Sequence, residues 1–430
     1  MREWIWRLGN FTGFFHPRLF SNLGVWSRAM NDRSLLAPMA YLREIRDYLR
    51  EREGDLWAWF TAERAKADYG EALRLNLQNS ATPLLPEAHP ELYRALENAQ
   101  LALGVDLPVT LYQAQDSSSQ SNATLFYLPN ESHIVLRGPI VSLLQPLEWT
   151  AVFGHELAHR LLWDAEDGDF LIADHLLDTI SRESGAQSAY VETARRFRLS
   201  TEIFADRGAF RATHDLTTTV TALVKISTGL TLANGEHYLE QAEAIFAQGE
   251  VTTSALSHPE IFMRVHALAR WTSGDGTVDT WVRAMVAEKP ELATLDLLEQ
   301  QSLTALTRRF LAQYLQPEWF QSEAVLAQAR RYFADFTPSE SEEDPTLVDE
   351  LRQSGKLLHE YFIFVLLDFV RVDPDLGQQP LIAALRWAEA LGASRPFEKL
   401  VAKELGVKAR ELAKIKPPTA AAVGWTEVKS

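Results

Sequence analysis

The stretch "GHELAHRLLW", residues 154–163, decides how the fold is interpreted, because it places two histidines four residues apart. On an α-helix, residues i and i+4 lie on one face, about 5–6 Å apart. His155 and His159 can therefore direct a ring nitrogen at one ion, and Glu156 stands where an HExxH site has its general base. The alternative is an amphipathic helix with two incidental histidines, since such a match arises by chance in roughly a few per cent of chains of this length. The stretch predicts a helix, and a metal site if a third ligand exists.

The composition limits which residues can bind a metal. The chain has 430 residues, 46% of them hydrophobic, and contains no cysteine. This length is sufficient for two or three domains. Because thiolate ligands are excluded, any metal must be bound by histidine, aspartate or glutamate.

Charge and hydropathy argue against two classes of partner. The formal net charge of −16 argues against a nucleic-acid partner, which requires a basic surface. No apolar run approaches the roughly 18 to 20 residues of a membrane span, and the first twenty residues lack the apolar core of a secretory signal. We therefore expect no membrane span and a cytoplasmic location.

A candidate third ligand occurs in "LSTEIFADRGAF", residues 199–210. Glu202 and Asp206 are four residues apart on a helical pattern, so both carboxylates share one face among apolar neighbours. We assign Glu202 to the metal. We assign Asp206 to a supporting role, in which it accepts a hydrogen bond from the distal nitrogen of a ligand histidine. The alternative is a surface helix whose acids face water.

The pattern along the chain predicts an α+β fold that is mainly helical. Helical spacing dominates residues 1–104, and β-branched and aromatic residues then indicate strands at 108–115 and 122–138, with "PNES" as a turn. We expect a small antiparallel sheet there, followed by the HExxH helix, in a catalytic domain of residues 105–276. Residues 277–430 form a second helical region, with an acidic linker or loop near 337–346.

Three motifs together resemble a known family. "GHELAH", "EIFAD" and "SHPEIFMR" (257–264) are similar, in this order, to the signatures of the CAAX prenyl protease and HtpX family of gluzincin zinc metallopeptidases. The resemblance covers about residues 105–270 and implies a zincin-like catalytic domain. It implies one Zn²⁺ per chain, a general base and a support for the ligands; the residues concerned are His155, His159 and Glu202 for zinc, Glu156 for the base and Asp206 for the support.

The third motif implies two further site residues. By resemblance, His258 lies over the zinc, where it stabilises the tetrahedral intermediate or occupies the open metal position in a latent state. Arg264 supports the cleft. "SHPE" also has the form of a helix capping box, with Ser257 as the cap, so a purely structural role stays open.

The strand carrying "SNATLFY", residues 121–127, precedes the active-site helix. An extended peptide can add to a sheet edge as one more strand. The resemblance implies this role for Asn122 and Ala123, and the alternative is an ordinary start of a strand.

Two functions from different classes follow. The first is a zinc endopeptidase that acts on a peptide or protein substrate, is latent or narrow in its substrate range, and has a possible regulatory partner. The second is a non-catalytic binding or chaperone-like protein with a structural zinc site. Glu156 favours the first, because a structural site does not need a base beside an open coordination position.

Overall fold

The computed structural model describes residues 36–62, 64–115, 121–248, 260–287, 291–338 and 344–415. The chain divides into two compact units, each with its own core. The first comprises Met1–Lys289 with Asp296–Leu298, and the second comprises Pro290–Leu295 with Glu299–Ser430. The division into regions 1–104, 105–276 and 277–430 stays a prediction.

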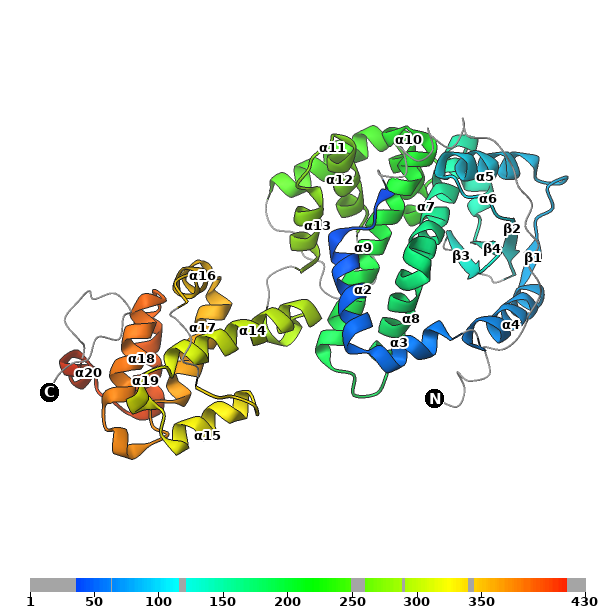
Figure 1. Cartoon of the computed structure of the whole chain (residues 1–430). Coiled ribbons are helices and arrows are strands. Elements are labelled where there is room, and N and C mark those ends of the chain that lie inside the picture. Colours follow the sequence, from blue (N-terminus) through cyan, green and yellow to red (C-terminus); the bar gives the residue numbers. More distant parts are fainter. Residues whose placement is uncertain are drawn as a thin grey trace. The chain divides into compact units, whose positions relative to one another are not determined.

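The first unit is mainly helical with one small sheet, so the predicted α+β class is confirmed (Figure 1). None of the described helices is both long enough and apolar enough to cross a membrane. The helices of this unit are α2 (Ala40–Arg52), α3 (Gly54–Thr61), α4 (Arg64–Ser80), α5 (Pro90–Leu103), α6 (Ile140–Leu143), α7 (Pro146–Asp164), the 3-10 turn η3 (Ala165–Gly168), α8 (Asp169–Ser181), α9 (Ser188–Thr213), α10 (Leu216–Thr228), α11 (Gly235–Ala247), α12 (Ile261–Thr272) and α13 (Val278–Ala287).

The sheet has four strands in the order β1-β2-β4-β3. They are β1 (Ala81–Pro83), β2 (Val109–Ala114), β3 (Asn122–Leu128) and β4 (Glu131–Arg137). The predicted antiparallel sheet is wrong in one respect, because β4 pairs in parallel with β2 and the sheet is mixed. The reason is burial: the five central residues of β4 are buried, so β4 takes a central position and leaves β3 at the edge.

The two faces of the sheet pack on different helices. On one face, Ile134 and Leu125 join a core with Phe153 and Leu157 of α7. On the other face, Val135 packs in a cluster that includes residues of α4. Among the described strands, β3 pairs only with β4 and is antiparallel to it. Strand β3 is therefore an edge of the sheet, and it contacts α7.

Helix α7 begins where its sequence supplies a start signal. Pro146 takes the first position, where its missing N–H is not needed, and the Gln145 N–H donates to the Glu148 carboxylate at 2.8 Å. The same carboxylate accepts from Lys225 Nζ of α10 at 2.8 Å, and both side chains are buried. This contact ties the start of α7 to its neighbour.

Helices α7 and α9 approach closely because glycine and alanine line their contact. Figure 1 shows α7 between α9 and β3. A Cβ atom built on Gly208 would meet the Cβ of Ala158 and lie 2.9 Å from the carbonyl oxygen of Gly154. A Cβ on Gly154 would lie 2.5 Å from the Cβ of Ala212. The helix spacing therefore depends on these small residues.

Gly208→Ala should push the two helices apart. We expect the free energy of unfolding to fall by about 1–3 kcal/mol, as overpacking usually costs. Zinc affinity should fall as well, because the residues that the sequence assigns to the metal lie on both helices. Chemical denaturation and zinc competition titration measure the two effects. Gly54→Ala is the matched control, since its Cβ would meet nothing within 4 Å. Equal losses in both variants would contradict the role of the close contact.

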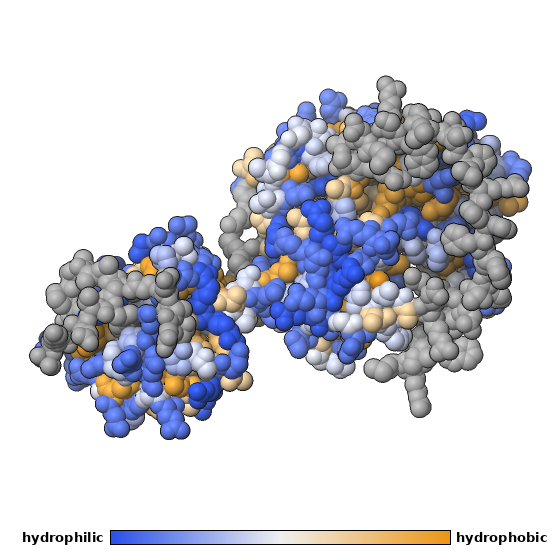
Figure 2. All heavy atoms as spheres, in the orientation of Figure 1, coloured by the Kyte–Doolittle hydropathy of each residue, from blue (hydrophilic) through white to orange (hydrophobic). Residues whose placement is uncertain are grey.

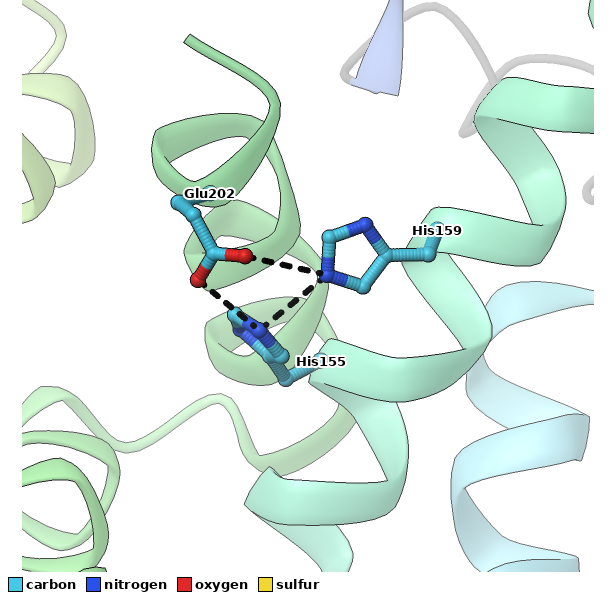
Figure 3. A group of neighbouring side chains, drawn as sticks. All are labelled: His155, His159 and Glu202. Carbon is cyan, nitrogen blue, oxygen red and sulfur yellow. Dashed lines mark hydrogen bonds and ion pairs between the residues drawn. The ribbon is translucent and has the colours of Figure 1, made fainter. Parts of the chain in front are cut away.

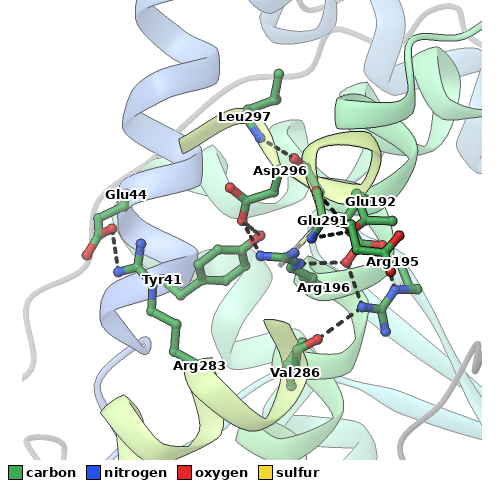
Figure 4. Close-up of polar contacts among 12 residues, drawn as sticks. Tyr41, Glu44, Glu192, Arg195, Arg196, Arg283, Val286, Glu291, Asp296 and Leu297 are labelled. Carbon is green, nitrogen blue, oxygen red and sulfur yellow. Dashed lines mark hydrogen bonds and ion pairs between the residues drawn. The ribbon is translucent and has the colours of Figure 1, made fainter. Parts of the chain in front are cut away.

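A buried ion pair anchors the segment that follows α13. Arg196 Nη1 of α9 lies 3.2 Å from Asp296 Oδ2, and the Tyr41 hydroxyl donates to the same oxygen at 3.0 Å (Figure 4). The next residue, Leu297, donates its N–H to Thr193 Oγ1 at 3.0 Å. These contacts explain why Asp296–Leu298 belongs to the first unit.

The second unit is helical where it is described, and Phe310, Tyr314, Phe362 and Trp387 belong to its core. Of the predicted acidic linker or loop near 337–346, residues 339–343 lie outside the described part. Among the coloured residues in Figure 2, hydrophilic ones predominate on the visible face, with smaller hydrophobic patches between them. The helical elements of the C-terminal part are η4 (Leu292–Thr294), α14 (Leu297–Tyr314), η5 (Glu318–Phe320), α15 (Glu323–Tyr332), α16 (Leu347–Gln353), α17 (Lys356–Asp368), η6 (Pro374–Leu376), α18 (Gln379–Ala390), α19 (Ser394–Leu405) and α20 (Ala409–Ile415).

Candidate metal centre

Three side chains from two helices converge on one point (Figure 3). His155 and His159 extend from successive turns of α7, and their Nε2 atoms are 3.3 Å apart. Glu202 of α9 places its carboxylate oxygens 3.6 Å from Nε2 of His155 and 3.7 Å from Nε2 of His159. The structure thus brings together the three residues that the sequence assigned to the metal.

These distances fit a tetrahedral zinc site. Ligand atoms at 2.0–2.1 Å from zinc lie about 3.3 Å from one another along the edges of a tetrahedron. The two Nε2 atoms are separated by that value, 3.3 Å, and each carboxylate oxygen of Glu202 lies close to one of them, Oε2 at 3.6 Å from His155 and Oε1 at 3.7 Å from His159. Two imidazoles and one carboxylate are also a ligand set typical of catalytic zinc, which keeps a fourth position for water.

Asp206 and Arg264 lie behind the three convergent side chains. Asp206 is fully buried, and its Oδ1 lies 3.1 Å from His155 Nδ1. Arg264 of α12 donates from Nε to Asp206 Oδ2 at 2.7 Å and places Nη1 3.4 Å from Glu202 Oε2. One guanidinium of α12 therefore contacts two carboxylates of α9.

Charges around the site separate the pKa values of the two histidines. Burial lowers the pKa of His155, but the hydrogen bonds with Asp206 and Glu202 outweigh burial and raise that pKa to about 10. Burial and the charge of His155 lower the pKa of His159 to about 4. Protonated His155 can therefore donate a hydrogen bond from Nε2 to neutral His159, and a metal ion would displace this proton on binding.

The pKa values of the two carboxyl groups near the histidines are shifted in opposite directions. Burial raises the pKa of Glu156 to about 7. Burial also raises the pKa of Asp206, but the charge of Arg264 outweighs it and the net pKa is lowered. Asp206 thus stays ionised near neutral pH, whereas Glu156 can take up and release a proton there.

Glu156 is held beside the edge strand. Its side chain is buried, and Oε2 accepts a hydrogen bond of 2.8 Å from the backbone N–H of Leu125 in β3. Since backbone groups alternate in direction along an antiparallel strand, Ala123 also turns its backbone away from β4. Accordingly, the Ala123 N–H donates to the Oδ1 of exposed Asn122 at 2.9 Å.

The structure describes one of the two further residues that the third motif placed in the site, and not the other. His258 lies outside the described residues. Arg264 is described, and its partners are Asp206 and Glu202, which sequence reasoning did not foresee. A signal was available, because a lone arginine in the apolar stretch "IFMRVHALA" requires a buried acid as its partner.

Comparison with known families agrees with this geometry. Residues 86–272 match the model of Peptidase family M48. This segment is similar to peptidase family M48. The resemblance to the CAAX prenyl protease and HtpX family is thereby confirmed. No curated protein and no solved structure matches the chain.

The M48 domain contains every described residue assigned to the site. Its match begins at residue 86 and so includes α5, which packs against α7. M48 peptidases are zinc-dependent metallopeptidases, which agrees with the His155, His159 and Glu202 cluster. The match therefore supports the metalloprotease class for this domain.

Proposed function

We propose that the chain is a zinc-dependent endopeptidase of the gluzincin type. His155, His159 and Glu202 hold one Zn²⁺ per chain. The observation that carries this proposal is the convergence of the three side chains, whose ligand atoms lie within 4.8 Å of one another, with the two histidine Nε2 atoms 3.3 Å apart. The ligand set and the M48 match support the same activity.

The chemistry requires a base beside the ion. Bound zinc would acidify a water molecule and polarise the scissile carbonyl. Glu156 takes the proton of that water and later gives it to the leaving amine. Burial supports this role, because a carboxyl with a pKa of about 7 exchanges protons near neutral pH. The Leu125 N–H holds the carboxylate in place.

Asp206 and Arg264 act as positioning residues. Asp206 accepts from His155 Nδ1 and so turns Nε2 toward the ion. Arg264 neutralises Asp206 and contacts Glu202, which holds this side of α9 against α12.

Asp206→Asn should weaken zinc affinity or activity by roughly 10- to 100-fold, as changes beside metal ligands do. The amide retains the shape of the carboxylate but loses the charge that pairs with Arg264. Competition with a fluorescent zinc chelator measures the affinity. Asp106→Asn is the control, since this exposed residue belongs to the same unit. Wild-type affinity and activity in Asp206→Asn would place Asp206 outside the site.

The edge strand β3 is the proposed substrate platform. A peptide adds beside Asn122 and Ala123 as one more antiparallel strand, with its scissile carbonyl directed at the ion. His258 is proposed either to stabilise the oxyanion or to take the fourth metal position in a latent state. Latency or a narrow substrate range, a possible regulatory partner and a cytoplasmic location all stay predictions.

The alternative is a non-catalytic protein with a structural zinc site. Glu156 distinguishes the two, because a structural site has no use for a buried carboxyl beside an open position. The test is digestion of a peptide library by zinc-loaded protein, with products identified by mass spectrometry. New peptides that disappear on chelation and return with zinc support the peptidase. Absence of products from a fully zinc-loaded protein favours the structural site.

A further inference from the structure

Two aromatic side chains lie beside the metal ligands on the side of the edge strand. Trp163 follows His159 by one helical turn, and their ring centroids are 5.7 Å apart. Tyr127 of β3 meets Trp163 edge to face, with centroids 6.2 Å apart. Both side chains are partly exposed. We call Tyr127 and Trp163 the aromatic wall.

The tyrosine of the wall is held in a fixed position. The guanidinium of Arg160 lies 4.1 Å from the centroid of the Tyr127 ring, and the Tyr127 hydroxyl donates to Asp164 at 3.0 Å. Arg160 also donates to Asp164 at 2.6 Å and to the carbonyl of Pro129 at 2.9 Å. These bonds fix the β3–β4 hairpin against α7, so the wall is preorganised.

The wall has a defined place relative to a bound strand. Tyr127 follows Leu125 by two residues, so both side chains lie on the face of the sheet that packs on α7. The backbone N–H of Leu125 is hydrogen-bonded to Glu156, so the proposed base lies beside this residue of β3. In an antiparallel pair, the residue opposite Tyr127 lies two positions nearer the amino terminus of the added strand than the residue opposite Leu125.

We propose that the aromatic wall is a substrate subsite for a large apolar or aromatic side chain on the amino-terminal side of the scissile bond. This inference rests on the proposed peptidase function. Paired residues of an antiparallel ladder project to the same face, so the substrate side chain opposite Tyr127 reaches Trp163. Aromatic faces favour contact with apolar and aromatic groups.

The local charges favour an apolar occupant over a cationic one. The carboxylate of Asp164 is already paired with Arg160 and accepts from Tyr127. A lysine or arginine of the substrate would thus meet the guanidinium of Arg160 without a free acid to offset it, leaving only the attraction of the ring faces.

The test uses a random peptide library and zinc-loaded wild-type protein, with cleavage sites mapped by mass spectrometry. We expect Phe, Leu, Trp or Tyr to be enriched at one position before the cleaved bond. Peptides with Phe there should be cleaved about tenfold faster, in kcat/KM, than peptides with Ala. Cleavage without enrichment at any such position, or enrichment of Lys or Arg, would overturn the inference.

Variants of the wall separate recognition from folding. Trp163→Ala should remove the preference for Phe over Ala, and Trp163→Phe should retain part of it. Zinc content and far-UV circular dichroism identify folded preparations. Trp319→Ala is the control, because Trp319 lies in the second unit, outside the M48 match, and should keep the full preference. An unchanged preference for Phe over Ala in folded Trp163→Ala would reject the aromatic wall as a substrate subsite.

A binding experiment decides the inference independently of hydrolysis. Zinc-loaded Glu156→Gln is titrated with pairs of fluorescent peptides that differ only in having Phe or Ala at the enriched position. If the wild type cleaves no peptide, a series is used in which Phe or Ala is placed at each position in turn. Tighter binding of Phe peptides that depends on Trp163 supports the wall, even if the wild type cleaves nothing and the proposed function fails. Equal binding of the Phe and Ala peptides at every position rejects the aromatic wall as a subsite, even if hydrolysis is established.

Discussion

Glu156→Gln should keep a full equivalent of zinc and lose hydrolysis by about 10²- to 10⁴-fold, the range typical of a general base. Glutamine retains the size of the side chain and an acceptor for the Leu125 N–H, but it cannot take a proton from water. The three residues that hold the ion are unchanged. Peptide cleavage assays with elemental analysis of the same preparation measure both properties.

An isosteric control separates this effect from the loss of any carboxylate. Glu183→Gln changes an exposed side chain of the same unit and should have wild-type activity. Unchanged cleavage of a verified substrate by Glu156→Gln would reject the peptidase mechanism. Loss of zinc from Glu156→Gln would instead show that Glu156 helps to hold the ion.

His159→Ala should lower zinc content below half an equivalent in protein purified without added metal, because it removes one of the three ligands proposed among the described residues. Activity should fall by more than the roughly 100-fold that changes around the ligands cost. Elemental analysis and peptide cleavage after dialysis give the two values. Addition of zinc should restore little activity.

The matched control for this variant is His237→Ala, whose imidazole is 78% exposed and lies on α11. It should contain one zinc per chain and cleave peptides as the wild type does. Full zinc occupancy in His159→Ala would mean that the ion is held by other residues, and the proposed centre would be wrong.

The sequence by itself determined the features that depend on short separations. The helical period places His155 and His159 on one face, and two β-rich stretches separated by "PNES" predict the β3–β4 hairpin. The ordered motifs were sufficient to recognise the family, which the M48 match confirms. The α+β class followed from the same local periodicities, because they need only the residues of one segment.

The role of Glu202 was an intermediate case. Its spacing from Asp206 indicates a shared helical face, but the distance from Glu202 to the histidines is not encoded in one segment. Only the contact of α7 with α9 sets it, and that contact depends on Gly154 and Gly208, whose missing side chains let the helices approach. The sequence therefore named the ligand, and packing supplied its separation of 3.6–3.7 Å from the histidines.

The tertiary structure alone decided how elements distant in the sequence meet. Burial on both faces puts β4 in the centre and makes the sheet mixed, which the antiparallel prediction missed. Three further contacts were likewise decided by the tertiary structure: the hydrogen bond from Leu125 to Glu156, the pairing of Arg264 with Asp206, and the aromatic wall beside His159. Each joins separate elements, and their approach results from the packing of the whole core rather than from the periodicity of any one segment.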